Sequence, residues 1–271
     1  MLQKEMRITV LGSGTSTGVP LIHCRCRVCR STHPRNQRTR TSVWVEVGGK
    51  SLLIDVSPDF RQQALRHRIP RLDGILITHP HADHIGGLDE IRSYNFVQKE
   101  RIAAWGHDWT LEELPARYPY IFRPSGKIEG GGIARVDLRP FGWDRRFRVA
   151  GIPVLALRLP HGSRSTAGFR IGDFAYLTDC SEVPEEAISR LGGLDLLILD
   201  CLKFAEHDTH LNYERALDYA VRIGAKKTVF THLSHDFDYV RDSRRLPKSV
   251  ALAYDGMIIN IRKPVKSRRS P

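Results

Sequence analysis

The segment Thr78-His79-Pro80-His81-Ala82-Asp83-His84 decides how this sequence is interpreted. It places three histidines and one aspartate within six residues, directly after the short apolar run 74–78. Imidazole nitrogens and carboxylate oxygens are ligands that divalent metal ions use. Pro80 and the pair Gly86-Gly87 favour a tight turn. Since one ion would not easily take four ligands from one hexapeptide, we expect these donors to converge on two neighbouring metal ions.

Four later apolar runs, each predicted as a strand, are also followed by a side chain that can bind metal. These residues are His161, Asp179, Asp200 and His232. In a layered α/β scaffold, polar groups at strand ends build a site along one sheet edge. Taken singly, His161 or His232 would more often be an ordinary histidine. Their repeated placement after strands predicts one shared site.

Strand and helix patterns alternate along the chain and predict an α/β fold. No composition shift marks a boundary, so we expect one domain over 1–262 and a frayed basic tail over 263–271. A β-hairpin is expected around Gly48-Gly49. Strands are expected over 7–11, 42–47, 51–56, 74–78, 133–138, 147–150, 153–159, 167–171, 174–178, 194–199, 227–231 and 257–261, and helices over 58–67, 88–97, 184–191 and 211–223.

The 271 residues carry a formal net charge of +12, with 41% hydrophobic and 27% charged side chains. This composition excludes a disordered or collagen-like chain. No stretch approaches the ~18 consecutive apolar residues of a membrane helix, and the first residues show no secretory pattern. These features favour a cytoplasmic protein without a membrane partner. The positive charge favours anionic partners such as phosphates, nucleotides or nucleic acid.

Three of the five cysteines, Cys24, Cys26 and Cys29, lie within six positions. An odd number of cysteines argues against a disulfide framework and for metal or thiol chemistry. The spacing C-x-C-x-x-C therefore predicts a metal site in the loop that follows the first strand. Cys180 and Cys201 are expected to be small buried residues.

The histidine-rich segment, with its strand before and helix after, resembles the metallo-β-lactamase superfamily. The resemblance implies an αββα sandwich, a four-layer fold in which helices cover two mixed sheets. It also implies a two-metal site completed by later residues of the chain. One metal would be held by His79, His81 and His161, the other by Asp83, His84 and His232, with Asp179 bridging the two.

A second resemblance rests on Gly12-Ser13-Gly14-Thr15-Ser16-Thr17-Gly18-Val19-Pro20 and the cysteines that follow. Together they look like the phosphoribosyl cyclic phosphodiesterases of the carbon–phosphorus lyase pathway. That group implies a structural zinc on Cys24, Cys26, Cys29 and His235, which would clip the loop 12–40 against the strand end at His232. His23 stands before the first cysteine and is a rival for the fourth ligand. The group also includes dimers, so a homodimer is one expected assembly.

The second resemblance implies hydrolysis of a small cyclic phosphate or nucleotide-like diester by a metal-bridging hydroxide that attacks phosphorus. Asp83 would be both a metal ligand and an orienter of that hydroxide. His210 matches a histidine that acts as general acid in related enzymes, and His207 is its competitor. Zinc, manganese and iron all suit the all-N/O donor set of the two active-site metals, and the group includes manganese-dependent members, so zinc or manganese is expected.

Three other functions stay open from the sequence. A tRNA 3′-end endonuclease of the same superfamily would fit the basic charge, but no clear RNA-gripping insertion lies between Asp83 and His161. A non-catalytic, zinc-clipped nucleic-acid-binding protein would not need the complete ligand set. Thioester or β-lactam hydrolysis would not need an acid at His210. We therefore expect a small anionic diester as substrate and place the segment 105–132 near the mouth of the site.

Overall fold

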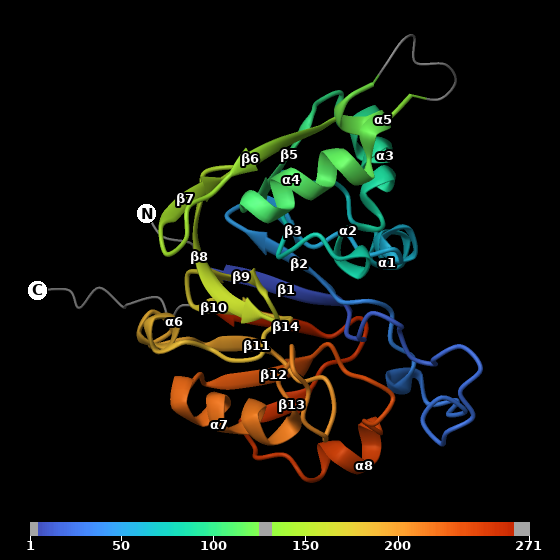
Figure 1. Cartoon of the computed structure of the whole chain (residues 1–271), viewed down its shortest axis with the longest axis vertical. Helices are drawn as coiled ribbons and strands as arrows, with labels where there is room; N and C mark the ends of the chain where they lie inside the picture. Colours follow the sequence, from blue (N-terminus) through green and yellow to red (C-terminus); the bar gives the residue numbers. More distant parts are fainter. Residues whose placement is uncertain (1–4, 125–131, 263–271) are drawn as a thin grey trace, which may run out of the picture.

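Two β-sheets lie between two layers of helices, as seen edge-on in Figure 1. The computed structural model describes residues 5–124 and 132–262. The expected basic tail, 263–271, lies outside the described residues. This arrangement confirms the predicted α/β class and the αββα sandwich. No helix in the described ranges is long and apolar enough to cross a membrane.

The first sheet has the order β14-β1-β2-β3-β4-β5-β6 and the second the order β13-β12-β11-β10-β9-β8-β7. Each sheet is mixed, because parallel pairs occupy one part of it and antiparallel pairs the other. The first sheet comprises β1 (Glu5–Gly12), β2 (Ser42–Val47), β3 (Lys50–Ile54), β4 (Gly74–Leu76), β5 (Ile102–Gly106), β6 (Val136–Pro140) and β14 (Ile258–Arg262). The second comprises β7 (Arg146–Val149), β8 (Ile152–His161), β9 (Arg164–Ile171), β10 (Phe174–Leu177), β11 (Leu196–Asp200), β12 (Lys227–Thr231) and β13 (Val250–Leu252).

Helices cover the outer face of each sheet. On the first sheet they are α1 (Phe60–His67), α2 (Ala82–Ile85), α3 (Ile91–Gln98), α4 (Asp108–Arg117) and α5 (Pro119–Phe122). Two 3-10 turns, η1 (Pro34–Asn36) and η2 (Leu88–Glu90), also belong to the N-terminal half of the sequence. On the second sheet they are α6 (Glu185–Ser189), α7 (Tyr213–Ile223) and α8 (Tyr239–Ser243). The amphipathic helix α7 ends at Gly224, which adopts a left-handed conformation that suits glycine.

The facing surfaces of the two sheets form the central core. Ile8 and Val45 of the first sheet pack in one cluster with Phe169, Tyr176 and Ile198 of the second, and all five are fully buried. Strand β11 is buried on both faces, which explains its unbroken apolar run before Asp200. Burial on this scale fixes the relative position of the two sheets, and with it the positions of their strand ends.

Several elements had no sequence prediction. They include β5, α4, α5, α8 and β13. The strand β5 reads Ile-Ala-Ala-Trp-Gly, with little of the β-branched pattern that predicts strands, and α4 contains Pro115. The helix expected over 88–97 instead begins as the 3-10 turn η2. These elements are specified by packing against the sheet more than by their own residues.

The carboxylate of Asp255 ties three distant segments together next to the loop 12–40. Its Oδ1 accepts hydrogen bonds from the backbone N–H (3.0 Å) and hydroxyl (2.8 Å) of Ser13. Its Oδ2 accepts from the backbone N–H (2.7 Å) and hydroxyl (2.6 Å) of Thr39. The two ends of the loop are thereby held to the β13–β14 connection.

Replacing Asp255 with alanine should lower the free energy of unfolding by about 2 kcal/mol, because four donors lose their acceptor. Denaturant titration measures this. The control is Asp218→Ala, which removes an exposed ion pair to Arg222 and should cost less than about 0.5 kcal/mol. Equal effects of the two substitutions would contradict a special role for Asp255.

Candidate active site

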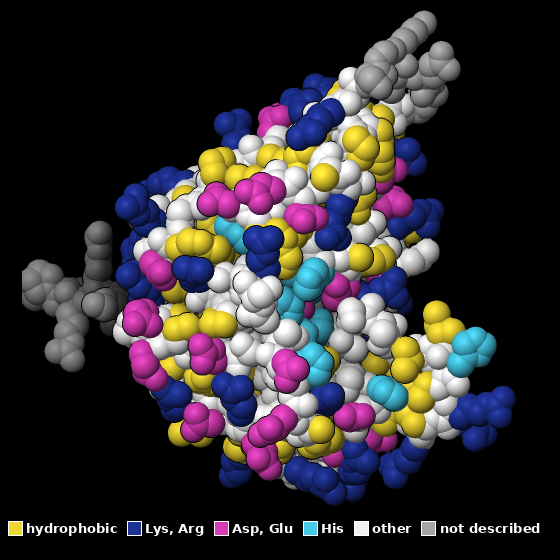
Figure 2. Space-filling view, viewed as in Figure 1, with side chains coloured by type: hydrophobic (Ala, Val, Ile, Leu, Met, Phe, Trp, Pro, Cys, Tyr) yellow, Lys and Arg dark blue, Asp and Glu magenta, His cyan; other side chains and the backbone are white. Residues whose placement is uncertain are grey.

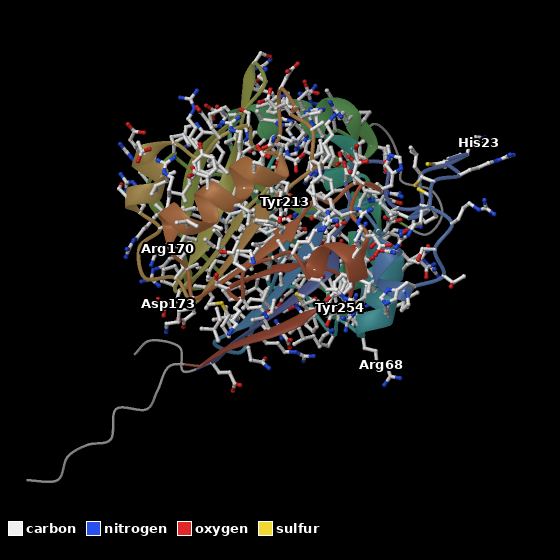
Figure 3. All side chains as sticks on the ribbon, turned by 90° about the horizontal axis from the view of Figure 1, so that it is seen from below. His23, Arg68, Arg170, Asp173, Tyr213 and Tyr254 are labelled. Carbon is white, nitrogen blue, oxygen red and sulfur yellow. The ribbon has the colours of Figure 1, made fainter. Side chains whose placement is uncertain are left out.

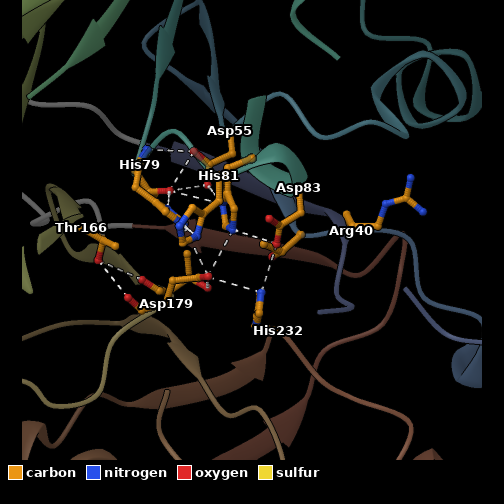
Figure 4. Close-up of polar contacts among 12 residues, drawn as sticks. Arg40, Asp55, His79, His81, Asp83, Thr166, Asp179 and His232 are labelled. Carbon is orange, nitrogen blue, oxygen red and sulfur yellow. Dashed lines mark hydrogen bonds and ion pairs between the residues drawn. The ribbon is translucent and has the colours of Figure 1, made fainter. Parts of the chain in front are cut away.

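The histidine-rich segment and the ends of β8, β10 and β12 meet at one edge of the two sheets. His79 and His81 follow β4, Asp83 and His84 lie in α2, and the second sheet contributes the other ligand candidates. Figure 2 shows histidine side chains gathered in the middle of this face. Figure 4 shows the labelled histidine and aspartate side chains pointing toward one another, whereas the labelled Arg40 points away from them. Residues up to 153 positions apart in the sequence thus share one site.

The first group consists of His79, His81 and His161, whose ligand atoms all lie within 4.8 Å of one another. Nε2 of His79 lies 2.8 Å from Nδ1 of His81. The ring of His161 lies 5.2 Å from each of the other two rings. Nδ1 of His161 donates a hydrogen bond to the carbonyl of Thr209 (3.0 Å), which leaves Nε2 with its lone pair free for a metal ion.

The second group consists of Asp83, His84, Asp179 and His232, all buried, with ligand atoms again within 4.8 Å of one another. Oδ1 of Asp179 lies 3.3 Å from Nε2 of His84 and 3.5 Å from Nε2 of His232. Its other oxygen, Oδ2, lies 3.7 Å from Nε2 of His79 in the first group. Asp179 therefore stands between the two groups, where a bridging carboxylate would have to stand.

Asp55 supports the second group and was missed by the sequence analysis. Its Oδ2 accepts a hydrogen bond from Nδ1 of His84 (2.7 Å), and its Oδ1 accepts from the backbone N–H of Thr78 (2.8 Å). This contact orients His84 so that Nε2 faces Asp83 and Asp179. The signal was present in the sequence, because Asp55 directly follows β3 as Asp200 ends β11.

A histidine–aspartate pair adjoins both groups. Oδ2 of Asp200 lies 3.3 Å from Nδ1 of His210 and accepts a hydrogen bond from the backbone N–H of Leu211 (2.9 Å). The ring of His210 lies 5.1 Å from that of His161 and 4.8 Å from that of His232. Nε2 of His210 is thus directed to the cluster, 3.9 Å from Oδ2 of Asp179.

His207, the competing candidate, lies further from the ligand groups. Its side chain is partly exposed, and its ring lies 5.2 Å from that of His210. Nδ1 accepts a hydrogen bond from the backbone N–H of Thr209 (3.3 Å). No carboxylate holds His207 as Asp200 holds His210 in the described residues.

Three residues of the site have a left-handed backbone that side chains other than glycine rarely adopt. The φ angles are 61° for Asp55, 56° for Asp179 and 59° for His232. Such conformations cost free energy and persist where the surrounding structure imposes them, often at functional sites. Here each one follows or ends a buried strand and turns a side chain into the cluster.

Burial and neighbouring charges set the protonation states of these groups. Burial lowers the pKa values of His79, His81 and His161. Burial would raise the pKa of Asp179, but the imidazoles of His232 and His84 hold it well below its usual range. Neutral imidazole and ionised carboxylate are the forms that bind metal.

The remaining histidines respond to the carboxylates. Burial would lower the pKa of His84, but Asp179, Asp83 and Asp55 raise it well above the usual range. Burial would likewise lower the pKa of His210, but the charge of Asp200 raises it to about 9. Within the described residues, Nε2 of His84 is buried without a hydrogen-bond partner although carboxylates face it. This donor set fits divalent cations, which would satisfy that nitrogen and the carboxylates together.

The three clustered cysteines converge on His235. Nδ1 of His235 lies 3.3 Å from Sγ of Cys24 and 3.4 Å from Sγ of Cys26. With Cys29, these atoms form one group within 4.8 Å. His23 does not belong to this group, and Figure 3 places it at the outer end of the loop. The geometry therefore favours His235 over His23 as the fourth partner of the thiols.

A network of contacts joins this loop to the active-site edge. The guanidinium of Arg38 is buried and donates hydrogen bonds to the carbonyls of Ser234 (3.2 Å) and Phe237 (2.8 Å). Leu233, next to His232, pairs with Gly14 in an isolated bridge. The loop 12–40 thus packs against the segment that carries both His232 and His235. Cys180 and Cys201 are fully buried, in agreement with the sequence prediction.

Residues 50–233 match the Beta-lactamase superfamily domain. The chain therefore belongs to the beta-lactamase superfamily, in its metal-binding, αββα form. A solved structure described as a new diphosphatase from the PhnP family is 38% identical, with a TM-score of 0.89. The match covers 96% of this chain and 98% of that one. This match to the PhnP family confirms the predicted resemblance to the phosphoribosyl cyclic phosphodiesterase group.

Two relatives carry other names. A Porphyromonas gingivalis protein named octanoyltransferase is 39% identical over 255 residues, which are 93% of this chain. The chain spans only about half (51%) of that protein's length, so the name need not describe the matching part. A coenzyme PQQ synthesis protein B from Methylobacterium radiotolerans is 29% identical over 72% of each chain.

Membership of this superfamily supports the assignment of the chain as a hydrolase that depends on divalent metal ions. The names of the relatives differ in reaction, so they leave the bond that is cleaved to be argued from the site.

Cys26→Ser should reduce the zinc content by about one ion per chain and lower Tm by at least about 5 °C, because the loop loses one of four converging ligands. Turnover should change less than stability. Elemental analysis and calorimetry measure these effects. The control is Cys180→Ala, a buried cysteine outside the group, which should keep its zinc. A zinc-replete, equally stable Cys26→Ser variant would show that the thiols do not form a metal site.

Proposed function

We propose that this chain is a phosphodiesterase that hydrolyses a small cyclic phosphate or a nucleotide-like diester. One observation carries the proposal: an imidazole paired with a buried carboxylate, His210 with Asp200, lies beside the two groups of metal-ligand candidates. Esters of phosphoric acid with poor leaving groups need a proton donor at this position. Thioesters and β-lactams do not depend on such an acid to the same extent.

His79, His81 and His161 would hold one divalent ion, and Asp83, His84 and His232 the other, with Asp179 shared between them. Two such ions activate water as a nucleophile and neutralise charge on the phosphoryl oxygens. Zinc and manganese both suit the all-N/O donors. In the cysteine group, three thiolates and His235 would hold a structural zinc, because four donors leave no open position.

His210 acts on the leaving oxygen. Its Nδ1 is engaged by Asp200, so the proton available to substrate is on Nε2, on the side of the cluster. Donation of that proton neutralises the departing alkoxide. Asp83, at the other side of the second group, is placed to accept a hydrogen bond from the attacking water, because its Oδ2 lies among His84 and His232.

A disubstituted diphosphate is the second candidate substrate. The relative with 38% identity is described as a diphosphatase. Hydrolysis of a diphosphate, like that of a phosphodiester, breaks a bond between phosphorus and one departing oxygen. A phosphate leaving group needs less help from an acid than an alkoxide does. Nucleic acid is not favoured, although the net charge of +12 fits it.

The function is tested by metal content and by turnover of bis(p-nitrophenyl) phosphate, 2′,3′-cyclic nucleotides, ADP-ribose and pre-tRNA. We expect about three metal ions per chain and hydrolysis of the small diesters. Asp179→Ala should lose active-site metal and at least about 100-fold in turnover while staying folded. The matched control is Asp195→Ala, before β11 and paired with Lys226, which should keep both.

Three results would redirect the assignment. If ADP-ribose is the one compound of the set that is turned over, the substrate is a disubstituted diphosphate rather than a small phosphodiester. Cleavage of pre-tRNA alone would select the endonuclease. One zinc and no hydrolysis, even with added manganese, would leave the non-catalytic binding protein.

His210→Ala should slow an alkyl diester, such as a cyclic nucleotide, by about 100-fold or more and an activated p-nitrophenyl diester by less than about 10-fold. The reason is that p-nitrophenolate departs without a proton. The control is His207→Ala, which should slow both esters by a similar small factor. Equal slowing of both esters by His210→Ala would reject the acid role.

A further inference from the structure

An indole and a guanidinium border the first ligand group, and neither has a role in the site described above. Trp109 lies in the first turn of α4, which covers the first sheet, and Arg164 is the first residue of β9 in the second sheet. The guanidinium carbon of Arg164 lies over the indole, 5.6 Å from its centre. The two side chains therefore meet across the boundary between the sheets, next to His81.

The position of Arg164 follows from the β8–β9 hairpin. His161 and Arg164 are direct cross-strand partners, joined by the two-residue turn Gly162-Ser163. Gly162 has a φ of 58°, which the turn requires. Directly opposed residues of an antiparallel pair place their side chains on the same face of the sheet. Arg164 is therefore directed to the side on which His161 faces the cluster.

The position of Trp109 follows from contacts with histidines. Its ring meets that of His81 edge to face, with centres 5.4 Å apart and planes at 89°, and lies 5.9 Å from that of His79. Behind it, the buried ring of His107 lies at 6.1 Å and in turn contacts the tilted ring of Trp143, with centres 4.7 Å apart. The indole is thus supported from behind and only partly buried.

Arg164 is exposed, and no carboxylate of residues 5–124 or 132–262 pairs with it. Over the described part of the chain its guanidinium makes no hydrogen bond and no ion pair, and its one side-chain contact of this kind is the indole. Many other arginines of the protein are paired, such as Arg158 of the same hairpin, which donates to the hydroxyl of Ser165 (3.0 Å). A free guanidinium beside an aromatic face suits a planar, electron-rich ring.

We propose that Trp109 and Arg164 bind the base of a nucleotide substrate, with the ring held between the indole and the guanidinium. Two stacking contacts of ~3.5 Å each need a separation of ~7 Å, so an exposed arginine side chain has to move outward by only ~1.4 Å. This inference rests on the proposed function and narrows its substrate to a nucleotidyl ester.

In this binding mode, the base that Trp109 and Arg164 hold belongs to the part of the substrate that stays attached to phosphorus when the leaving group departs. His210, which serves the leaving oxygen, contacts His161 and His232, whereas Trp109 contacts His81 and His79. The two ends of the substrate would therefore lie on different sides of the cluster. A base on the departing group would instead lie near His210.

The test compares two esters with the same leaving group, thymidine 5′-(p-nitrophenyl) phosphate and methyl p-nitrophenyl phosphate. Trp109→Ala should lower kcat/KM for the thymidine ester by about 5- to 150-fold, and for the methyl ester by less than about 3-fold. Trp109→Phe should restore part of the loss, because a smaller aromatic face remains. Arg164→Ala should also affect the thymidine ester selectively, and the control Arg158→Ala should affect neither.

Equal losses on both esters, with a lower Tm, would show that the pair only joins the two sheets. An Arg164 effect on both esters without a Trp109 effect would indicate an anion contact. No loss for either variant would also overturn the subsite.

A binding measurement separates this proposal from the proposed function. If the unaltered protein cleaves neither ester, the phosphodiesterase assignment fails, but the subsite can still be tested. Calorimetric titration of the metal-loaded chain should show AMP binding about 5- to 150-fold tighter than ribose 5-phosphate, and Trp109→Ala should abolish that preference. Equal affinity for the two ligands in the unaltered protein would overturn the subsite whatever the reaction is.

Discussion

The two oxygens of Asp179 face the two halves of the site. Oδ2 lies 3.7 Å from Nε2 of His79, which follows a strand of the first sheet. Oδ1 lies 3.5 Å from Nε2 of His232, which follows a strand of the second. A carboxylate buried to this degree costs free energy unless positive charge surrounds it. The packing of the sheets therefore determines the charge balance of the site, because a shift between the sheets would separate Asp179, which follows β10 of the second sheet, from His79 and His84.

The loop 12–40 extends this dependence to the segment that directly follows β12 and His232. It is held by Asp255 at its ends, by Arg38 on the carbonyls of Ser234 and Phe237, and by the cysteine group on His235. All these contacts lie within a few residues of His232 along the chain or across the sheet. Since His232 has a left-handed backbone, it needs such support to keep its imidazole in the cluster. The cysteine group thus lies beside the segment that carries His232 and shares no residue with the two groups of the candidate active site.

The sequence predicted the ligand candidates well because each follows an apolar strand and carries a distinctive side chain. His79, Asp179 and His232 could be found from that pattern, and the structure brings them together. Asp55 shares the pattern but was not recognised, because a single aspartate after a hairpin strand has many ordinary explanations. Its role depends on sheet order, which places β3 next to β4 and so sets Asp55 behind Thr78 and His84.

Trp109 and Arg164 could not have been predicted by the same reasoning. The sequence placed 105–132 near the mouth of the site, but it did not predict α4, and nothing in the residues linked that segment to the hairpin after His161. Their contact depends on how one helix and one turn from different sheets approach each other. Such contacts follow from the packing of the whole core, which no local pattern encodes.

The charge of the molecule is divided between its surface and its centre. The net charge is +12, yet four carboxylates, those of Asp55, Asp83, Asp179 and Asp200, are buried together at the site. The basic surface steers anions toward the protein over a distance set by salt. At the centre the carboxylates alone would repel a phosphate, so the proposed phosphate substrate would need divalent cations on the donor set. Arg164 is different from both, because it presents a fixed positive charge at the rim whether or not metal is bound. In the proposed binding mode, the surface charge would act on an anionic diester first and the metal-ligand cluster last, and the guanidinium of Arg164, held over the indole of Trp109, would stack on the base rather than bind the phosphate.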